Sequence, residues 1–145
     1  MSQNEKILLV EDDPKDVELT LSALADNSIA NEVVVTRDGT EALDYLYRRG
    51  SYAARADRDP VLILLDIKLP KVDGLQVLHQ LKSDDRLKAL PIVMLTSSNE
   101  EKDVVRSYNL GVNAYVVKPV DFDEFAAAIK QLGLFWMIIN RPPQL

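Results

Sequence analysis

The sequence contains no cysteine, which excludes disulfide frameworks, thiolate zinc sites and cysteine nucleophiles. Its five glycines form neither the dinucleotide-binding pattern G-x-G-x-x-G nor a phosphate-binding P-loop. The sequence therefore lacks the motifs that are typical of nucleotide-dependent enzymes. No apolar run approaches the ~20 residues that a membrane-spanning helix needs. The polar start of the chain, Met1 to Lys6, lacks the apolar core of a signal peptide. We therefore expect a cytoplasmic protein that does not bind membranes.

The composition is that of one folded domain. A chain of 145 residues is long enough for a sizeable core but leaves little room for a second domain. With 47% hydrophobic and 28% charged residues, it has the composition of a globular protein and not of a disordered one. The formal net charge of -6 opposes binding to nucleic acids. Proteins and small ions are the expected partners.

Short apolar runs alternate with longer amphipathic stretches along the chain, which is the pattern of a βα-repeating protein. We predict an α/β fold of five βα units with a doubly wound, flavodoxin-like parallel sheet of strand order 2-1-3-4-5. The third and fourth runs are apolar at every position, as expected for the most buried, central strands. The five predicted strands are Ile7 to Val10, Val33 to Val35, Val61 to Leu65, Ile92 to Leu95 and Tyr115 to Val117.

Polar residues stand where four of these predicted strands end. In a parallel sheet these ends share one edge, so separate segments contribute to a single cleft. Taken alone, Asp66 reads equally well as a helix cap, and Lys118 as the partner of a surface acid, but the joint arrangement argues against that reading. The residues at the strand ends are Glu11, Asp12 and Asp13, then Asp66, then Thr96, then Lys118 with Pro119.

Such a cleft holds several like charges. Two carboxylates ~4 Å apart at an effective dielectric constant near 20 repel each other by roughly 4 kcal/mol, whereas a charge-assisted hydrogen bond returns only roughly 1.5 to 3 kcal/mol. A divalent cation compensates this repulsion. Hard oxygen ligands and the lack of cysteine favour Mg²⁺, which takes one or two carboxylates and keeps several waters.

A carboxylate, Mg²⁺, a hydroxyl and a lysine together suit phosphoryl transfer. Asp66 can attack phosphorus and form an acyl phosphate. The cation, the Thr96 hydroxyl and the Lys118 ammonium then each pair with one phosphoryl oxygen. The predicted chemistry is self-phosphorylation followed by slow hydrolysis, which does not make the protein an enzyme acting on a separate substrate.

Four segments of the sequence, in this order, resemble the receiver domains of bacterial response regulators. The resemblance covers almost the whole chain, and the pattern D-x-x-L-P-x-x-D-G is fairly specific. It implies a response regulator of a two-component phosphorelay, which accepts a phosphoryl group from a sensor histidine kinase and then changes its protein interactions. The four segments are Ile7 to Pro14, Leu64 to Gly74, Met94 to Ser97 and Tyr115 to Pro119.

The resemblance also implies roles for individual positions. Asp66 would accept the phosphoryl group, Asp12 and Asp66 would ligate Mg²⁺, and Glu11 would hold a metal-bound water. Asp13, one place beyond the acidic pair, is the less favoured ligand. The other implied features are a metal-ligating backbone carbonyl at Lys68, phosphate contacts from Thr96 and Lys118, a switch pair of Thr96 and Tyr115, a cis peptide bond before Pro119, and a turn at Gly74.

Ser97 and Lys68 bear on how long the phosphoryl group would persist. Ser97 stands where many receivers carry alanine, so its hydroxyl either crowds the phosphate or forms a hydrogen bond elsewhere. Lys68 can alter the access of hydrolytic water.

His79 is the only histidine, so the chain receives its phosphoryl group from another protein. His79 itself reads as an ordinary surface residue.

An alternative function is a receiver-like binding module that does not use phosphorylation. It fits the fold, but a degraded site would be expected, and the set at the strand ends is intact. Residues 47–60 form a long connection with four arginines, which we interpret either as a solvated surface loop or as a loop that docks a partner.

The C-terminal segment is unusually apolar. We expect residues 1–145 to be a single receiver domain with an extension of the last helix at about 133–145, and no output domain after it. Leu134 to Ile139 is apolar around a full helical circumference, so one packed stripe cannot bury all of it. It either forms a homodimer or partner interface, with Phe135, Trp136 and Ile139 as candidates, or folds back on its own domain. Together with the long connection at residues 47–60, this extension resembles the small response regulators that pair with bacterial and cyanobacterial phytochrome kinases.

Overall fold

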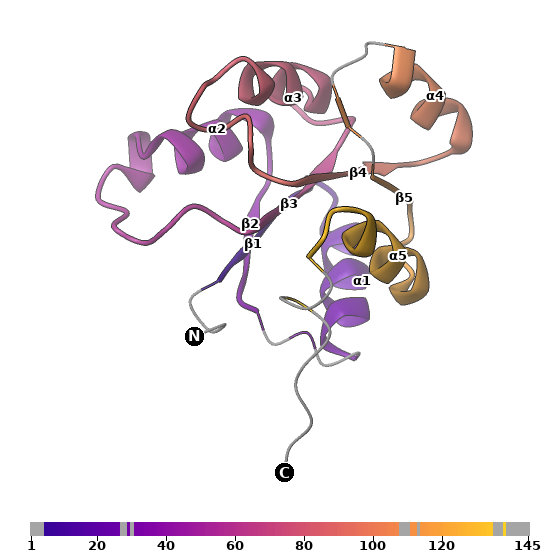
Figure 1. Cartoon of the computed structure of the whole chain (residues 1–145). Coiled ribbons are helices and arrows are strands. Elements are labelled where there is room, and N and C mark those ends of the chain that lie inside the picture. The colour runs from indigo at the N-terminus through magenta and orange to yellow at the C-terminus, as the bar shows by residue number, and fades with distance from the viewer. Residues whose placement is uncertain are drawn as a thin grey trace.

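The computed structural model describes residues 5–26, 29, 31–107, 111–112, 114–134 and 138. Within them five strands and five α-helices alternate along the chain (Figure 1). The strands are β1 (Ile7–Val10), β2 (Val33–Thr36), β3 (Leu62–Asp66), β4 (Ile92–Thr96) and β5 (Tyr115–Val117). The helices are α1 (Pro14–Ala25), α2 (Gly39–Tyr47), α3 (Gly74–Lys82), α4 (Asn99–Ser107) and α5 (Phe122–Gln131).

All the strand pairs are parallel, and the order is β2-β1-β3-β4-β5. The predicted α/β class, the flavodoxin-like order and the number of strands are therefore confirmed. β3 and β4 are buried at every position, as predicted, but so is β1, because it lies between β2 and β3. The order reverses at β1 and β3, which places the carboxyl ends of these two strands at the crevice where such sheets bind ligands.

Each face of the sheet has its own hydrophobic core. One core packs α1 and α5, through Val17 and Phe125, against one face. The other packs α2, α3 and α4, through Leu46, Leu78 and Val105, against the opposite face. Figure 1 shows this arrangement, with α1 and α5 together on one side of the strands and α2 and α3 on the other. Because strand side chains alternate between faces, the central strands are apolar throughout and become polar only where they end.

Local capping fixes where the helices next to the crevice begin. Asp13 accepts a hydrogen bond from the Lys15 N–H, and Pro14 occupies the first position of α1, where no N–H donor is needed. Asp73 and Gln76 form a reciprocal capping box at α3.

Gly74 follows Asp73, and a Cβ atom there would lie 2.0 Å from the Asp66 carbonyl oxygen. Only glycine lets α3 begin this close to the end of β3.

The connection between α2 and β3 contains a short 3-10 helix, η2 (Gly50–Tyr52). The prediction of a solvated loop is wrong for Arg55, whose side chain is only 6% exposed. Its guanidinium lies 4.1 Å from the centre of the Tyr45 ring, donates to the Tyr45 carbonyl at 2.9 Å, and contacts Asp59. These contacts of Arg55 hold the loop against α2. The partner-docking alternative stays a prediction.

Part of the C-terminal extension contacts the core of its own domain. Leu134 packs against the α1–α5 core, and Ile138 is buried within that core. The interface candidates Phe135, Trp136 and Ile139 lie outside the described residues. Among the described helices, none combines the length and apolar character needed to cross a bilayer.

Candidate functional site

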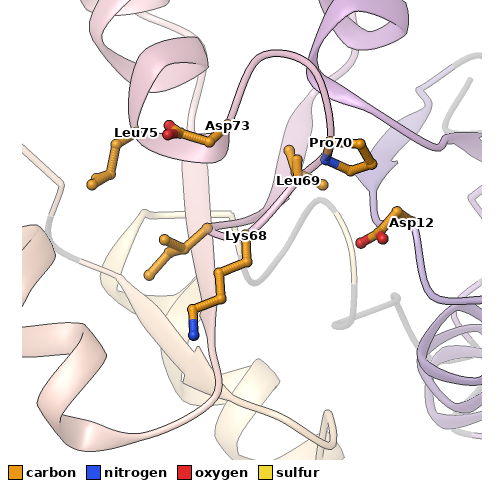
Figure 2. A pocket seen from close by; sticks show the side chains of 7 residues that line it. Asp12, Lys68, Leu69, Pro70, Asp73 and Leu75 are labelled. Carbon is orange, nitrogen blue, oxygen red and sulfur yellow. The ribbon is translucent and has the colours of Figure 1, made fainter.

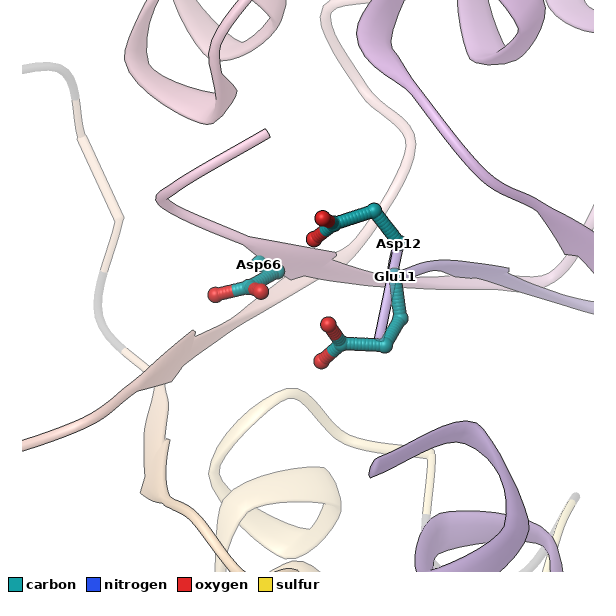
Figure 3. A group of neighbouring side chains, drawn as sticks. All are labelled: Glu11, Asp12 and Asp66. Atoms are coloured by element: carbon teal, nitrogen blue, oxygen red, sulfur yellow. The ribbon is translucent and has the colours of Figure 1, made fainter. Parts of the chain in front are cut away.

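The polar residues at the strand ends meet at the carboxyl edge of the sheet. Asp66 is the last residue of β3 and pairs in register with Leu95 of β4. Thr96 is the last residue of β4, and Glu11 directly follows β1. Figure 3 shows the carboxylates of Glu11 and Asp12 turned from the end of β1 toward the side of Asp66. The predicted convergence of these segments is therefore observed.

Glu11, Asp12 and Asp66 form a tight acidic cluster. One carboxylate oxygen from each lies within 4.8 Å of the others. Glu11 is fully buried and Asp66 is 4% exposed, whereas Asp12 faces solvent. Asp13 is not part of this cluster, because its side chain caps α1. Two carboxylates of the cluster are therefore buried, and the third, that of Asp12, is exposed to solvent.

Lys118 supplies the positive charge in the crevice. Its Nζ donates to Glu11 Oε1 at 3.0 Å, to Asp66 Oδ2 at 3.0 Å and to Asp16 Oδ2 at 3.2 Å. Burial disfavours the ammonium, but the hydrogen bonds and charges of Asp66 and Glu11 outweigh it and raise the pKa of Lys118 above its ordinary value. Lys118 is therefore held as a cation. The peptide bond between it and Pro119 is cis.

Asp16 belongs to the site but was not predicted from the sequence. It lies in the first turn of α1, and in a sequence an acidic residue there reads as a partner of the helix dipole. Its contact is with Lys118, which is 102 residues away along the chain. The only available signal was its position one helical turn after the acidic residues that follow β1.

Glu11 is held in an environment that opposes its ionisation. Burial is the main cause, followed by the adjacent Asp66 carboxylate, and together they raise the pKa of Glu11 to about 7, although Lys118 acts in the opposite direction. One ammonium therefore does not compensate all the carboxylates that surround it.

The donor set of the cluster suits a hard divalent cation. Carboxylate oxygens are the preferred ligands of Mg²⁺ and Ca²⁺, and three of them converge here without a histidine beside them. An open pocket of about 420 Å³ lies beside the cluster and is lined by Asp12 together with Lys68, Pro70 and Asp73 from the connection between β3 and α3 (Figure 2). The acidic cluster is therefore accessible from solvent through Asp12.

Thr96 brings an unpaired hydroxyl to the same edge. It is fully buried, and its Oγ1 has no hydrogen-bond partner among the described residues. A buried hydroxyl without a partner costs free energy, so this group is available to a ligand. The neighbouring Ser97 is bound differently, because both of its donors contact Glu101.

The remaining predicted residues lie farther from the acidic cluster. The hydroxyl of Tyr115 donates to the Val112 carbonyl at 3.0 Å, and the Lys102 ammonium lies 5.5 Å from the centre of its half-buried ring. His79 is exposed on α3, away from the strand ends. Within the part of the chain that the structure describes, His79 is not a member of the acidic cluster.

The raised pKa of Glu11 gives a testable pH dependence. Because the folded state favours protonated Glu11, its ionised form destabilises the fold above about pH 7, and this effect disappears as the pH falls through the ordinary value of 4.5. We expect Glu11→Gln to raise the melting temperature of the divalent-free protein at about pH 8, by about 2–4 °C for each kcal/mol of repulsion removed. Near about pH 4 the substitution should have no such effect. Scanning calorimetry measures both.

Glu18→Gln is the matched control, since it removes an exposed carboxylate from α1. It should leave the melting temperature unchanged at both pH values. A lower melting temperature for Glu11→Gln than for wild type at the higher pH would contradict the proposed destabilisation by ionised Glu11.

Comparison with known proteins places this site in a family. Residues 7–130 match the response regulator receiver domain. Response regulator Rcp1 from Synechocystis sp. is 39% identical over 131 residues, which cover 90% of this chain and 88% of Rcp1. Its Mn²⁺-bound structure aligns with a TM-score of 0.73 at 37% identity, covering 97% and 99% of the two chains.

Two further solved structures are similar. The bacteriophytochrome response regulator AtBRR is 62% identical, with a TM-score of 0.90 and coverage of 94% of this chain and 98% of AtBRR. The phosphorylated cyanobacterial phytochrome response regulator RcpA is 44% identical, with a TM-score of 0.72 and coverage of 92% and 94%. The family match spans most of the chain, and these relatives share both its sequence and its fold. The chain therefore belongs to the response regulator receiver domain family of two-component signalling and is similar to phytochrome response regulators.

Proposed function

We propose that this protein accepts a phosphoryl group on Asp66 from the phosphohistidine of a sensor histidine kinase. The observation that carries the proposal is the position of the Asp66 carboxylate, nearly buried, 3.0 Å from the Lys118 Nζ and beside Glu11 and Asp12. A binding module that does not use phosphorylation would not need this complete set of groups. Phosphorylation is therefore favoured over that alternative.

The chemistry is a displacement at phosphorus. A carboxylate oxygen of Asp66 forms a bond to phosphorus while the phosphorus–nitrogen bond of the donor breaks, and the released imidazole takes up a proton. Lys118 already contacts the attacking carboxylate and is positioned to pair with a phosphoryl oxygen. Thr96 offers its unpaired hydroxyl to another. Later attack by water on phosphorus breaks its bond to the Asp66 oxygen and releases inorganic phosphate and free Asp66. The protein therefore catalyses only its own phosphorylation and slow dephosphorylation.

We propose Mg²⁺ as the cofactor. Asp12 and Asp66 would ligate it directly, together with the backbone carbonyl of Lys68, and Glu11 would act through a water. When bound, Mg²⁺ supplies positive charge that the phosphoryl oxygens and the carboxylates share. The open side of the cluster at Asp12 and the Mn²⁺-bound structure of the relative Rcp1 support this assignment.

We further propose a phytochrome-type photoreceptor kinase as the partner, because the similar structures of AtBRR and RcpA are named as phytochrome response regulators. A kinase that makes phosphohistidine from ATP places the reaction in the cytoplasm.

Thr96 and Tyr115 would form the switch, in which the Thr96 hydroxyl moves toward the phosphate and the Tyr115 ring moves inward. This would alter the surface formed by α4, β5 and α5.

Phosphorylation can be tested with acetyl phosphate and Mg²⁺, read by intact mass. We expect one phosphoryl adduct on wild type, none on Asp66→Asn, and a much smaller adduct when Mg²⁺ is removed by chelation. Asp85→Asn, which alters an exposed carboxylate, serves as the control and should match wild type. No adduct on wild type, or an equal adduct on Asp66→Asn, would overturn the proposed function.

The switch can be tested by comparing Tyr115→Ala with wild type in ¹⁵N NMR spectra, with and without beryllofluoride, a non-covalent phosphoryl mimic. We expect Tyr115→Ala to bind the mimic but to lose most of the accompanying shifts in the amide signals of α4 and α5, because no ring is left to move. Tyr115→Phe keeps the ring and should retain most of these shifts. The switch role fails if Tyr115→Ala shows the same shifts as wild type.

We also propose that the C-terminal extension forms a homodimer. Leu134 and Ile138 contact their own core, so the dimer proposal depends on Phe135, Trp136 and Ile139, whose apolar side chains one packed stripe cannot bury as well. We expect a light-scattering mass of twice the 16.3 kDa chain for wild type and of one chain for Phe135→Ala/Trp136→Ala. A monomeric wild type would rule the dimer out.

A further inference from the structure

Glu101, in the first turn of α4, holds both hydrogen-bond donors of Ser97. The Ser97 N–H donates to Oε1 at 2.8 Å, and the Ser97 hydroxyl donates to Oε2 at 3.0 Å. The Glu101 side chain is only 12% exposed, whereas the adjacent Glu100 is exposed. One carboxylate therefore occupies the two donors of Ser97 at the same time.

Ser97 lies close to the reacting carboxylate in the fold. Asp66 pairs in register with Leu95, so Thr96 and Ser97 are the next two residues along β4 and its end. On the facing loop, Lys68 follows Asp66 by two residues, and its Nζ lies 3.8 Å from the same Glu101 carboxylate. Lys68 also lines the pocket that opens at Asp12 (Figure 2). Glu101 thus binds donors and positive charge from the two segments that directly follow Asp66 and its register partner Leu95.

We propose that Glu101 is a positioning residue whose carboxylate takes the place of a phosphoryl anion at Ser97, so that phosphorylation of Asp66 releases Glu101 from Ser97. The inference rests on the proposed function and deepens it. A phosphoryl group brings a charge of about -1.5 to -2 and three strong acceptor oxygens. It competes with Glu101 for the donors of Ser97 and Lys68, and it repels the Glu101 carboxylate.

The release of Glu101 would act on α4. The Glu101 N–H also donates to Ser98 Oγ at 3.2 Å, so this residue links the start of the helix to the end of β4 from both its backbone and its side chain. The next residue, Lys102, places its ammonium over the ring of Tyr115. Loosening this turn therefore connects the charge at Asp66 with the surroundings of Tyr115, through residues that are in contact.

The test is the affinity for beryllofluoride in the presence of Mg²⁺, titrated by ¹⁹F NMR on the full chain. Glu101→Gln keeps an acceptor for the Ser97 N–H and removes the charge. We expect it to bind beryllofluoride at least about fivefold more tightly than wild type, which is the lower end of couplings between two sites. A residue that only caps α4 would change the melting temperature and leave this affinity unaltered or weaker, and either result would overturn the proposal.

Glu100→Gln is the matched control, because it removes the same charge from the same turn at an exposed position. It should change the affinity by less than about twofold, since exposed charges are screened. An equal gain from Glu100→Gln would show a general charge effect and overturn the specific role of Glu101.

A second measurement uses the wild type alone. When beryllofluoride is bound, the ¹³C signal of the Glu101 carboxylate carbon should move toward that of the exposed Glu100. An unchanged signal at saturating beryllofluoride overturns the release of Glu101 and leaves the proposed function standing. A wild type that neither binds beryllofluoride nor takes a phosphoryl group from acetyl phosphate overturns the proposed function, and the inference with it.

Discussion

One ammonium group, the Nζ of Lys118, joins the elements that meet at the carboxyl edge of the sheet. It donates to Glu11 after β1, to Asp16 in α1 and to Asp66 at the end of β3. Without it, buried carboxylates would face one another in a region of low dielectric constant, where like charges repel strongly. Even with it the charge is not balanced, because burial and the neighbouring Asp66 still raise the pKa of Glu11 to about 7. The arrangement of the crevice thus depends on this lysine, and the crevice keeps negative charge that the lysine leaves uncompensated.

The fold keeps that charge in place. Asp66 ends β3, and all the residues of β3 before it are apolar. Both faces of this strand are covered, so the backbone of Asp66 has little freedom. Gly74 then brings the start of α3 against the carbonyl of Asp66, at a distance that no side chain would allow. The two hydrophobic cores offset the cost of burying like charges, and one of them extends to the crevice through Ile67 and Leu69. Apolar packing therefore lets the site remain unfavourable in charge while the domain stays folded.

The sequence predicted the sheet, the strand ends and the acidic cluster because each follows from a local pattern. Apolar runs mark buried strands, and a polar residue that directly follows such a run lies at the edge of the sheet. Asp13 could also be set apart, since it comes just before Pro14 at the start of a helix. The contacts of Asp16 with Lys118 and of Arg55 with Tyr45 could not be predicted. Each depends on a side chain reaching another segment, and the local sequence around both reads as an ordinary charged surface. Glu101 lies only four residues after Ser97, but the sequence does not show that its carboxylate accepts from both Ser97 donors.

Ser97 shows what such contacts add to the interpretation of a site. From the sequence, its hydroxyl could crowd a phosphate or bind elsewhere, and the structure shows it bound to Glu101. The two sides of Asp66 then differ in kind. On the side of β1, the excess carboxylates would attract a cation and be stabilised by it. On the side of β4, the donors are already occupied by a carboxylate of the protein, which a new anion must displace. A phosphoryl group on Asp66 would therefore be neutralised on the side of β1 and would compete with Glu101, in the first turn of α4, on the side of β4.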